Sequence, residues 1–534
     1  MIRPLVPPSL LPKVIARKKR TYALNKALKV CPLAPPWQRG LSLCGTGGSY
    51  RHDMHDTTID MLPDNVLLEI FDLCRRNPDR YQQFFHPAWN WHFLVHVCQR
   101  WRQVVFGSPH RLNLKILCTY GTPVRKNLCI WPAFPVIIDY RYPYSKRGNT
   151  PNDEDNVIAA LEHPDRVCCV GLLITSSLLG KMTTVIQEPF PVLTRLSILS
   201  DDGNAPALPS GFLGGSAPCL QEITLSRVSY PTLPMLLLSA SDLVALYLYN
   251  IPPTGYISPE TVIASLATLA RLETFIIEFQ SATSRPDRIH PPPVTRTVLP
   301  ALTYFKFRGA SEYLEDLVAR IDSPQLNRIY IDYLNQFVDF QVAQLSKFID
   351  RSVGPKLNLL RHAQVTFSCG EVSFNMYRQL DHQTWDYLAR TIVSCEGIDW
   401  QVSHMAQVLS HFSATLSTVV HLKLEIPLEV PLKESRQLEG TDDVEWPLLL
   451  HQFSSVQTLH VSQDLVGHIA LVLEDTPREM VAEMLPSLDL ICLSGQPASS
   501  VEKFVAARQL SGHSVTVIDT ETEFDERLES YVSK

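Results

Sequence analysis

Two histidines, His92 and His96, are spaced i and i+4, which places both imidazoles on one face of a helix, as in a zinc-binding pair. The glutamate of an H-E-x-x-H motif is missing between them, and no third ligand follows nearby. We therefore expect no metal here and interpret both as helix-surface histidines.

Other patterns that could carry catalysis are incomplete. The glycine-rich run Gly45-Thr46-Gly47-Gly48-Ser49 lacks the lysine of a phosphate-binding loop, and no G-x-S-x-G nucleophile motif occurs. The 12 cysteines are scattered without a C-x-x-C pair, and no N-x-[ST] sequon is present. We expect a chain without catalytic residues or cofactor, with reduced thiols, in the cytoplasm or the nucleus.

The charge is distributed unevenly along the 534 residues. Residues 1–51 hold ten of the 48 Lys and Arg and no acid, leaving 38 basic against 54 acidic residues after position 51, a net charge of −16. An acidic body repels phosphate, so we expect no nucleic-acid partner. No run of about 18 apolar residues is present, so we expect no membrane span.

Residues 1–57 are expected to form a disordered basic leader. Three interpretations stay open: a solvated leader or a translation start at Met54 or Met61, a mitochondrial presequence, and a nuclear-localisation signal at Arg17-Lys18-Lys19-Arg20. Four prolines within the first 12 residues disfavour the continuous amphipathic helix that a presequence needs.

Residues 58–112 are expected to form a small helical module. One helix should begin at Leu62-Pro63-Asp64, since proline suits the first turn, and end before Asn77-Pro78. A second helix should carry Phe93, Val97, Trp101 and Val104 or Val105 on one face, and end at Gly107-Ser108-Pro109. Two short helices bury little apolar surface, so the module should need a partner.

A repeated pattern, apolar-x-x-apolar-x-apolar, predicts strands in the array expected over 161–520. Its triplets begin every 23 to 30 residues at Val167, Leu193, Leu220, Leu243, Leu272, Leu302 and Leu326, and return at Leu360, Val419, Val456 and Leu488. Helices are expected between them, over 260–272, 312–321, 337–348, 376–393, 405–416 and 478–485, several capped by Ser or Thr. Stacked strand–helix units bury their apolar faces against neighbouring units, which defines a solenoid.

The expected fold class is therefore α/β: an all-α module followed by an irregular leucine-rich-repeat solenoid of parallel strands with outer helices. The Asn or Cys that usually follows each strand of such repeats is missing. An ordinary α/β domain with similar buried strands is the alternative. Residues 113–160 are expected to be a linker segment, and 521–534 a C-terminal tail.

The two parts together resemble fungal F-box proteins with degenerate leucine-rich repeats. The resemblance rests on Leu62-Pro63-Asp64-Asn65-Val66-Leu67-Leu68-Glu69-Ile70-Phe71, on Val97-Cys98-Gln99-Arg100-Trp101-Arg102, which is similar to the family's V-C-x-x-W-R, and on the segment Pro109 to Leu114. The sequence departs from the family in the long segment between the two halves, Asn77 to His92.

The resemblance implies a substrate-recognition subunit of a Skp-cullin-F-box ubiquitin ligase, bound to cullin through a Skp-type adaptor. The residues implied at the adaptor interface, or else in the core of the module, are Leu62, Pro63, Val66, Leu67, Ile70, Phe71, Val97 and Trp101. Helix periodicity favours Leu67, Phe71 and Trp101 as the inward-facing members. A cap that only protects the open end of the repeats is the structural alternative.

The array would bind a protein substrate. Strand alternation predicts outward-facing residues at Arg195, Thr224, Tyr247, Thr274, Tyr304, Lys306, Tyr330 and Lys423, of which Tyr247, Tyr304, Lys306 and Tyr330 are the predicted substrate-binding set. The alternative function is a leucine-rich-repeat interaction scaffold with no role in ubiquitin transfer.

Overall fold

The computed structural model describes residues 59–75, 91–141, 150–202, 205–282, 295–334, 342–357, 360–379, 385–395, 398–427, 445–475, 484–494 and 501–519. Contacts within the chain divide it into two compact units, Met1–Pro63 and Asp64–Lys534. The described part of the first unit contains one 3-10 turn, η3 (Ile59–Met61). The predicted leader over 1–57 and tail over 521–534 lie outside the described residues.

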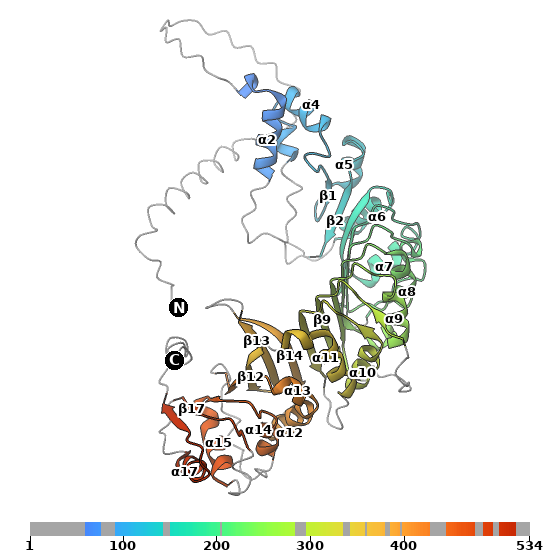
Figure 1. Cartoon of the computed structure of the whole chain (residues 1–534). Helices are drawn as coiled ribbons and strands as arrows, with labels where there is room; N and C mark the ends of the chain where they lie inside the picture. Colours follow the sequence, from blue (N-terminus) through green and yellow to red (C-terminus); the bar gives the residue numbers. More distant parts are fainter. Residues whose placement is uncertain are drawn as a thin grey trace, which may run out of the picture. The chain divides into compact units, whose positions relative to one another are not determined.

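The second unit begins with three helices, α2 (Asp64–Arg75), α3 (Trp91–Leu94) and α4 (Gln99–Gly107), which we call the helical module (Figure 1). The prediction of one helix through Phe93 and Trp101 is wrong. The helix is interrupted at Cys98, whose extended backbone (φ −153°) caps α4 while its sulfur accepts a hydrogen bond from the Trp101 N–H. This break leaves Phe93 and Val97 exposed, whereas Val95 and Val105 are buried.

A large mixed sheet makes up the rest of the second unit (Figure 1). Its strands lie side by side in the order β1 (Ile116–Cys118), β2 (Val136–Tyr140), β3 (Val167–Ile174), β4 (Arg195–Ser200), β5 (Glu222–Ser226), β6 (Ala245–Ile251), β7 (Thr274–Phe279), β9 (Tyr304–Gly309), β11 (Arg328–Tyr333), β14 (Trp385–Ser394), β13 (Glu371–Gln379), β12 (Leu360–Ser368), β15 (His421–Glu425), β16 (Thr458–Val461), β17 (Leu490–Leu493) and β18 (Thr516–Asp519). A separate parallel pair joins β8 (Thr297–Val298) to β10 (Ile321–Asp322). The second and third apolar residues of every predicted triplet lie in one of these strands.

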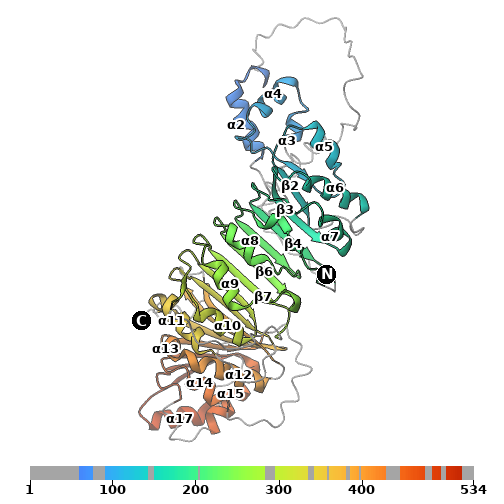
Figure 2. The same ribbon diagram turned by 90° about the vertical axis from the view of Figure 1, so that its right-hand side faces the viewer.

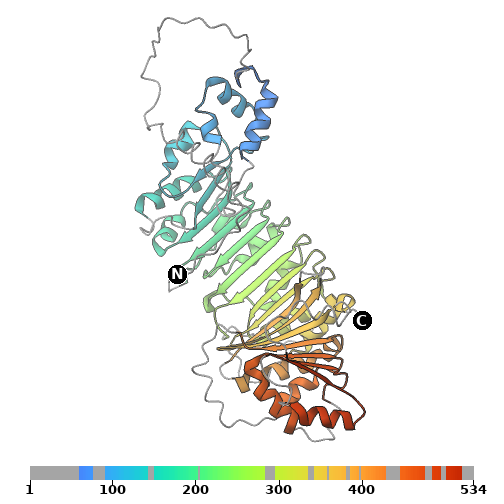
Figure 3. The ribbon, with the colours of Figure 1, turned by 90° about the vertical axis from the view of Figure 1, so that its left-hand side faces the viewer.

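The connections between strands are mostly helical. They contain α5 (Val124–Ile130), α6 (Pro151–Leu161), α7 (Ser176–Met182), α8 (Leu233–Ser239), α9 (Pro259–Leu266), α10 (Ser311–Ala319), α11 (Ala343–Leu357), α12 (Ile398–Leu409), α13 (Ser413–Leu416), α14 (Glu445–His451), α15 (Gln463–Asp475) and α17 (Glu502–Leu510). Over β2 to β9 the helices cover one face of the sheet (Figure 2), and the other face shows bare strands (Figure 3). No helix of the described residues has the length and apolar character needed to cross a bilayer.

The core lies between the strands and the helices. Leu246, Phe275, Phe305 and Ile329 occupy the same register position on β6, β7, β9 and β11, and each is at most 1% exposed. The rings of Phe275 and Phe305 stack with their centroids 5.7 Å apart. Each repeat therefore closes the apolar face of the one before it, as a solenoid requires.

The prediction that residues 113–160 are a linker is wrong. These residues contribute β1 and β2, which pair in parallel with each other and with β3, so the sheet begins at Ile116. Most of β2 is buried on both faces. A strand buried in this way shows no apolar–polar alternation and is hard to recognise in a sequence.

The predicted helix over 376–393 is also wrong. This segment forms parts of β13 and β14, which together with β12 make an antiparallel meander. The turn before β13 contains Gly370 with φ +86°, a conformation that favours glycine. Because the meander has three strands, its two outer strands, β12 and β14, run in the same direction. Strand β14 therefore pairs in parallel with β11, and β12 pairs in parallel with β15.

The remaining predicted helices agree in part. Ser258 caps α9 as expected, but α10 begins after Ala310, and Ser311 lies inside it. The predicted helices over 337–348 and 405–416 correspond to parts of α11 and of α12 with α13. The one over 478–485 lies mostly outside the described residues.

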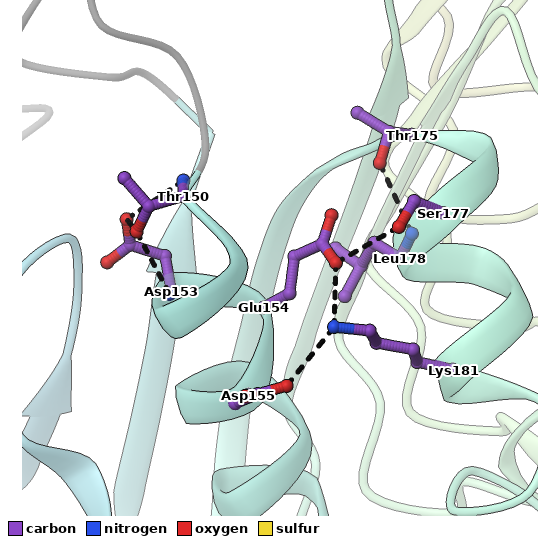
Figure 4. A network of polar contacts seen from close by, with 8 residues as sticks. All are labelled: Thr150, Asp153, Glu154, Asp155, Thr175, Ser177, Leu178 and Lys181. Atoms are coloured by element: carbon purple, nitrogen blue, oxygen red, sulfur yellow. Dashed lines mark hydrogen bonds and ion pairs between the residues drawn. The ribbon is translucent and has the colours of Figure 1, made fainter.

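Polar contacts hold neighbouring repeats together on the helical side (Figure 4). Thr150 and Asp153 form a capping box at the start of α6. Lys181 of α7 reaches Glu154 and Asp155 of α6 at 3.0 and 3.1 Å. Lys181 and Asp155 are exposed and Glu154 is largely buried, so these pairs align adjacent helices and contribute modestly to stability.

Candidate interaction surfaces

Helix α2 has apolar side chains on two opposite faces. Leu67, Leu68 and Phe71 are buried on one side of the helix, and the ring of Phe71 lies 4.7 Å from that of Trp101. Val66, Ile70 and Leu73 follow at i, i+4 and i+7, which places them along the opposite side of the helix. Val66 is 36% exposed and Leu73 65% exposed, and Ile70 is partly exposed. We call Val66, Ile70 and Leu73 the α2 stripe.

The structure separates the eight residues of the predicted adaptor interface by burial. Leu67 and Phe71 point inward as the periodicity predicts, and Trp101 is half-buried against Phe71. Val66 and Ile70 lie in the α2 stripe. Val97 follows the end of α3 and is exposed. In the first unit, Leu62 is half-buried and Pro63 is exposed. Leu73 was not predicted, although its spacing from Val66 and Ile70 carries the signal.

An aromatic cluster attaches the helical module to the first strands. The ring of Trp91 lies 5.3 Å from that of Trp131 and 5.6 Å from that of Phe134, and its indole N–H donates to the Lys115 carbonyl at 2.9 Å. Burial, with a smaller effect of His96, lowers the pKa of His92 in this cluster to about 4. The module therefore packs on the sheet through α3 and α4, while the α2 stripe stays exposed.

The helix-free face of the sheet carries a row of long polar and aromatic side chains. Tyr247, Lys306, Tyr330 and Arg390 share one register position on β6, β9, β11 and β14, with Ile276 of β7 between the first two. The Lys306 ammonium lies 4.5 Å from the centroid of the Tyr330 ring, and the Arg390 guanidinium lies 5.4 Å from it. All four predicted substrate-binding residues thus lie on this face, with Tyr304 two residues before Lys306 on β9.

Carboxylates on the same face are paired with cations. Lys306 reaches Glu278 at 2.8 Å, and Arg308 reaches Asp332 at 3.0 Å. Burial is the largest effect on Asp332 and raises its pKa to about 6, with Arg308 opposing the shift. The charges of this part of the sheet are therefore largely balanced internally.

A hollow of about 520 Å³ lies on this face where β6, β7, β9 and β11 begin. We call it the tyrosine hollow, and its lining residues are Tyr247, Thr274, Thr303, Tyr304, Asn327, Arg328 and Tyr387. The Arg328 guanidinium lies 6.0 Å from the Tyr387 ring centroid. Burial raises the pKa of Tyr247, and burial together with Tyr387 raises that of Tyr304, so both phenols are neutral near pH 7.

The other four outward-facing residues of the prediction lie at different places along the sheet. Arg195 pairs with Glu222 at 2.9 Å near the N-terminal end, and Lys423 pairs with Glu425 on β15. Thr224 is half-buried beside Tyr247 on the neighbouring strand. Thr274 is in the tyrosine hollow.

Three histidines lie on neighbouring strands near the C-terminal end of the sheet. His362 of β12 stacks on His421 of β15 with the rings 4.4 Å apart, and His460 follows on β16. Burial is the main cause that lowers the pKa of His362 and of His460 to about 4 and also lowers that of His421. Across the described ranges, no three His, Cys, Asp or Glu side chains are grouped as metal ligands.

Comparisons with known proteins are sparse. Neither a protein-family model nor a curated protein matches the sequence. Among solved structures, the chain is similar to the leucine-rich-repeat-containing protein LegL7 from Legionella pneumophila, with 15% identity and a TM-score of 0.25 over 65% of this chain and 98% of that chain. The stacked strand–helix units described above are themselves consistent with an irregular leucine-rich-repeat solenoid, a fold that suits a protein-interaction scaffold.

Proposed function

We propose that this chain is a non-catalytic substrate-recognition subunit of a Skp-cullin-F-box type ubiquitin ligase. The helical module binds a Skp-type adaptor, and through it cullin, and the helix-free sheet face binds a protein substrate. Ubiquitin transfer is then carried out by partner subunits, which act on a substrate held close to them.

The observation that carries this proposal is the exposed α2 stripe. A 12-residue helix that already buries Leu67 and Phe71 has no structural need for three more apolar side chains on its opposite side. The sheet does not cover this side, since Val66 remains 36% exposed. An apolar helix face that is left open in this way indicates a protein partner.

The energetics are sufficient for such a partner. Each apolar side chain that is taken out of water contributes about 1.5–3 kcal/mol. Burial of Val66, Ile70 and Leu73 in a groove would therefore give enough free energy for a specific contact, with Val97 as a further apolar anchor. The resemblance of Leu62 to Phe71 and of Val97 to Arg102 to F-box motifs selects the Skp-type adaptor as that partner.

The test is binding of a purified Skp-type adaptor to the full chain. Val66→Glu with Leu73→Glu should abolish adaptor capture, because two carboxylates would be buried without partners, while glutamate preserves the helix. The matched control is Met235→Glu with Leu238→Glu on α8, two residues that are also exposed, at 62% and 49%. It should leave capture unchanged.

Two results would contradict the proposal. One is failure of the intact chain to bind the adaptor, which would favour the interaction scaffold without a role in ubiquitin transfer. The other is equal capture by wild type and the α2 variant, which would show that the adaptor uses a different surface.

A further inference from the structure

We infer that the tyrosine hollow binds an acidic side chain, a carboxylate or a phosphoryl group, on an extended segment of the protein substrate. This inference rests on the proposed function only in assigning the sheet face to substrate. The lining residues argue for the ligand's chemistry independently of the adaptor.

The lining has the composition of an anion site. Arg328 supplies a guanidinium, Asn327 an amide, and three tyrosines and Thr274 supply hydroxyls, while none of the seven lining residues carries a carboxylate. The hydroxyl of the other threonine, Thr303, already donates to the Glu273 carbonyl at 3.1 Å. Guanidinium and hydroxyl groups form their strongest hydrogen bonds to carboxylate and phosphoryl oxygens. This composition contrasts with the net charge of −16 that residues 52–534 carry.

The tyrosines are in the protonation state that the ligand requires. Tyrosine is protonated at neutral pH with its ordinary pKa of about 10, and burial raises the pKa of Tyr247 and of Tyr304 further. The Tyr304 hydroxyl also hydrogen-bonds to Tyr387 within the hollow. The Tyr387 ring lies beside the Arg328 guanidinium, 6.0 Å from its centroid, and this contact helps to hold the guanidinium at the hollow.

The surroundings favour a protein segment over a free small anion. The row continues from Tyr247 to Tyr330 over three strand spacings, about 14 Å, which matches roughly four residues of an extended chain. Tyr330 and Arg390 are half-buried at the end of this row. The Tyr330 ring and the Arg390 guanidinium are therefore available to the substrate residues on either side of the acidic one. Tyrosine and arginine are the side chains that most often carry binding energy at protein interfaces.

The experiment uses the full chain and a library of 12-residue peptides in matched sets with Glu, Gln or phosphoserine at the central position. The peptides with Glu or phosphoserine should be bound in preference to those with Gln. Comparing the affinity of the Glu peptides with that of the phosphoserine peptides identifies whether the hollow prefers a carboxylate or a phosphoryl group. Arg328→Gln should reduce that preference by about tenfold or more, the size of a lost charge-assisted hydrogen bond.

The matched control is Arg195→Gln, which removes an exposed arginine from the same face, on β4 and outside the hollow. It should keep the preference, and unchanged melting temperatures should show that both variants fold. Absence of binding, absence of an acidic preference, or a preference that Arg328→Gln leaves intact would overturn the inference. Adaptor binding is measured separately, so a chain that prefers acidic peptides without binding adaptor would refute only the proposed function.

Discussion

In α2, apolar side chains lie on two opposite faces, whereas in strands β6, β9 and β11 they lie mainly on one. Leu246, Phe305 and Ile329 all point into the core, and the other side of these strands carries Tyr247, Lys306 and Tyr330. The repeats thus bury their apolar face within the chain. The helical module leaves part of its apolar surface exposed.

Under the proposed function, this difference gives the two regions different modes of recognition. The α2 stripe offers apolar area, which attracts any complementary groove. The sheet face offers tyrosines, arginines and paired carboxylates, which select a ligand by the positions of its charges. The proposed function accordingly assigns the first region to a constant partner and the second to a specific substrate.

The largest expected effect is in the core of the array. Phe305→Ala should destabilise the chain by about 3–5 kcal/mol, because the fully buried ring contacts Phe275 and leaves a cavity. Leu73→Ala, on the exposed side of α2, should change stability by less than about 0.5 kcal/mol. Thermal unfolding followed by circular dichroism measures both. Similar losses for the two variants would show that the contrast between the regions is wrong.

Within the helical module the two faces of α2 should also differ. Leu67→Ala should cost about 2–5 kcal/mol and speed amide exchange through Asp64–Arg75, since Leu67 is fully buried. Val66→Ala should leave exchange nearly unchanged. Equal acceleration by both substitutions would mean that the α2 stripe is already packed against the protein.

A smaller effect is expected from pH at the C-terminal end of the sheet. Because His362 and His460 have native pKa values of about 4 against 6.5 in the unfolded chain, the unfolded state binds more protons between these values. Stability should fall as the pH drops from 6.5 to 4, by about 1–3 kcal/mol once solvent screening is counted.

The variant His362→Gln with His460→Gln should reduce that slope in pH-dependent melting. Asp332 acts in the opposite sense: its raised native pKa of about 6 makes stability fall as the pH rises from 3.8 to 6. Its contribution remains in the variant, so the difference between the two curves isolates the histidines. A slope that is the same in both proteins would contradict the assignment.

The smallest effect belongs to the ion pairs between repeats. Lys181→Ala removes the contacts to Glu154 and Asp155 but should lower the melting temperature only slightly (Figure 4). Lys181 and Asp155 are exposed, and the largely buried Glu154 carboxylate keeps the hydrogen bond that the Ser177 hydroxyl donates. A clear decrease would show that these pairs, as well as the core, determine how the repeats stack.

The sequence predicted the strands of the repeats well because their pattern is local. In β5, β9 and β11 the apolar residues alternate with outward ones, and period-2 burial of this kind can be read directly. The prediction was wrong over 376–393, where the pattern is ambiguous. Tyr377 and Leu388 belong to this segment, whose apolar spacing also fits a helix. That error concealed Tyr387 and Arg390 from the predicted substrate-binding set.

The tyrosine hollow could not be predicted from the sequence for a further reason. Thr303 and Asn327 come just before β9 and β11, where strand alternation has not begun, and only the register of neighbouring strands brings them into the same hollow as Tyr247. The α2 stripe, by contrast, follows from helix spacing alone. Its exposure depends on how α3 and α4 pack, which the break at Cys98 decides.

The central claim is that the α2 stripe is a binding face for another protein. Hydrogen exchange of the full chain, measured with and without a purified Skp-type adaptor, tests it most directly. We predict that the adaptor slows amide exchange in Asp64–Arg75 and leaves β6, β9 and β11 unchanged. Unchanged exchange in α2, or protection found only in the sheet, would contradict the claim.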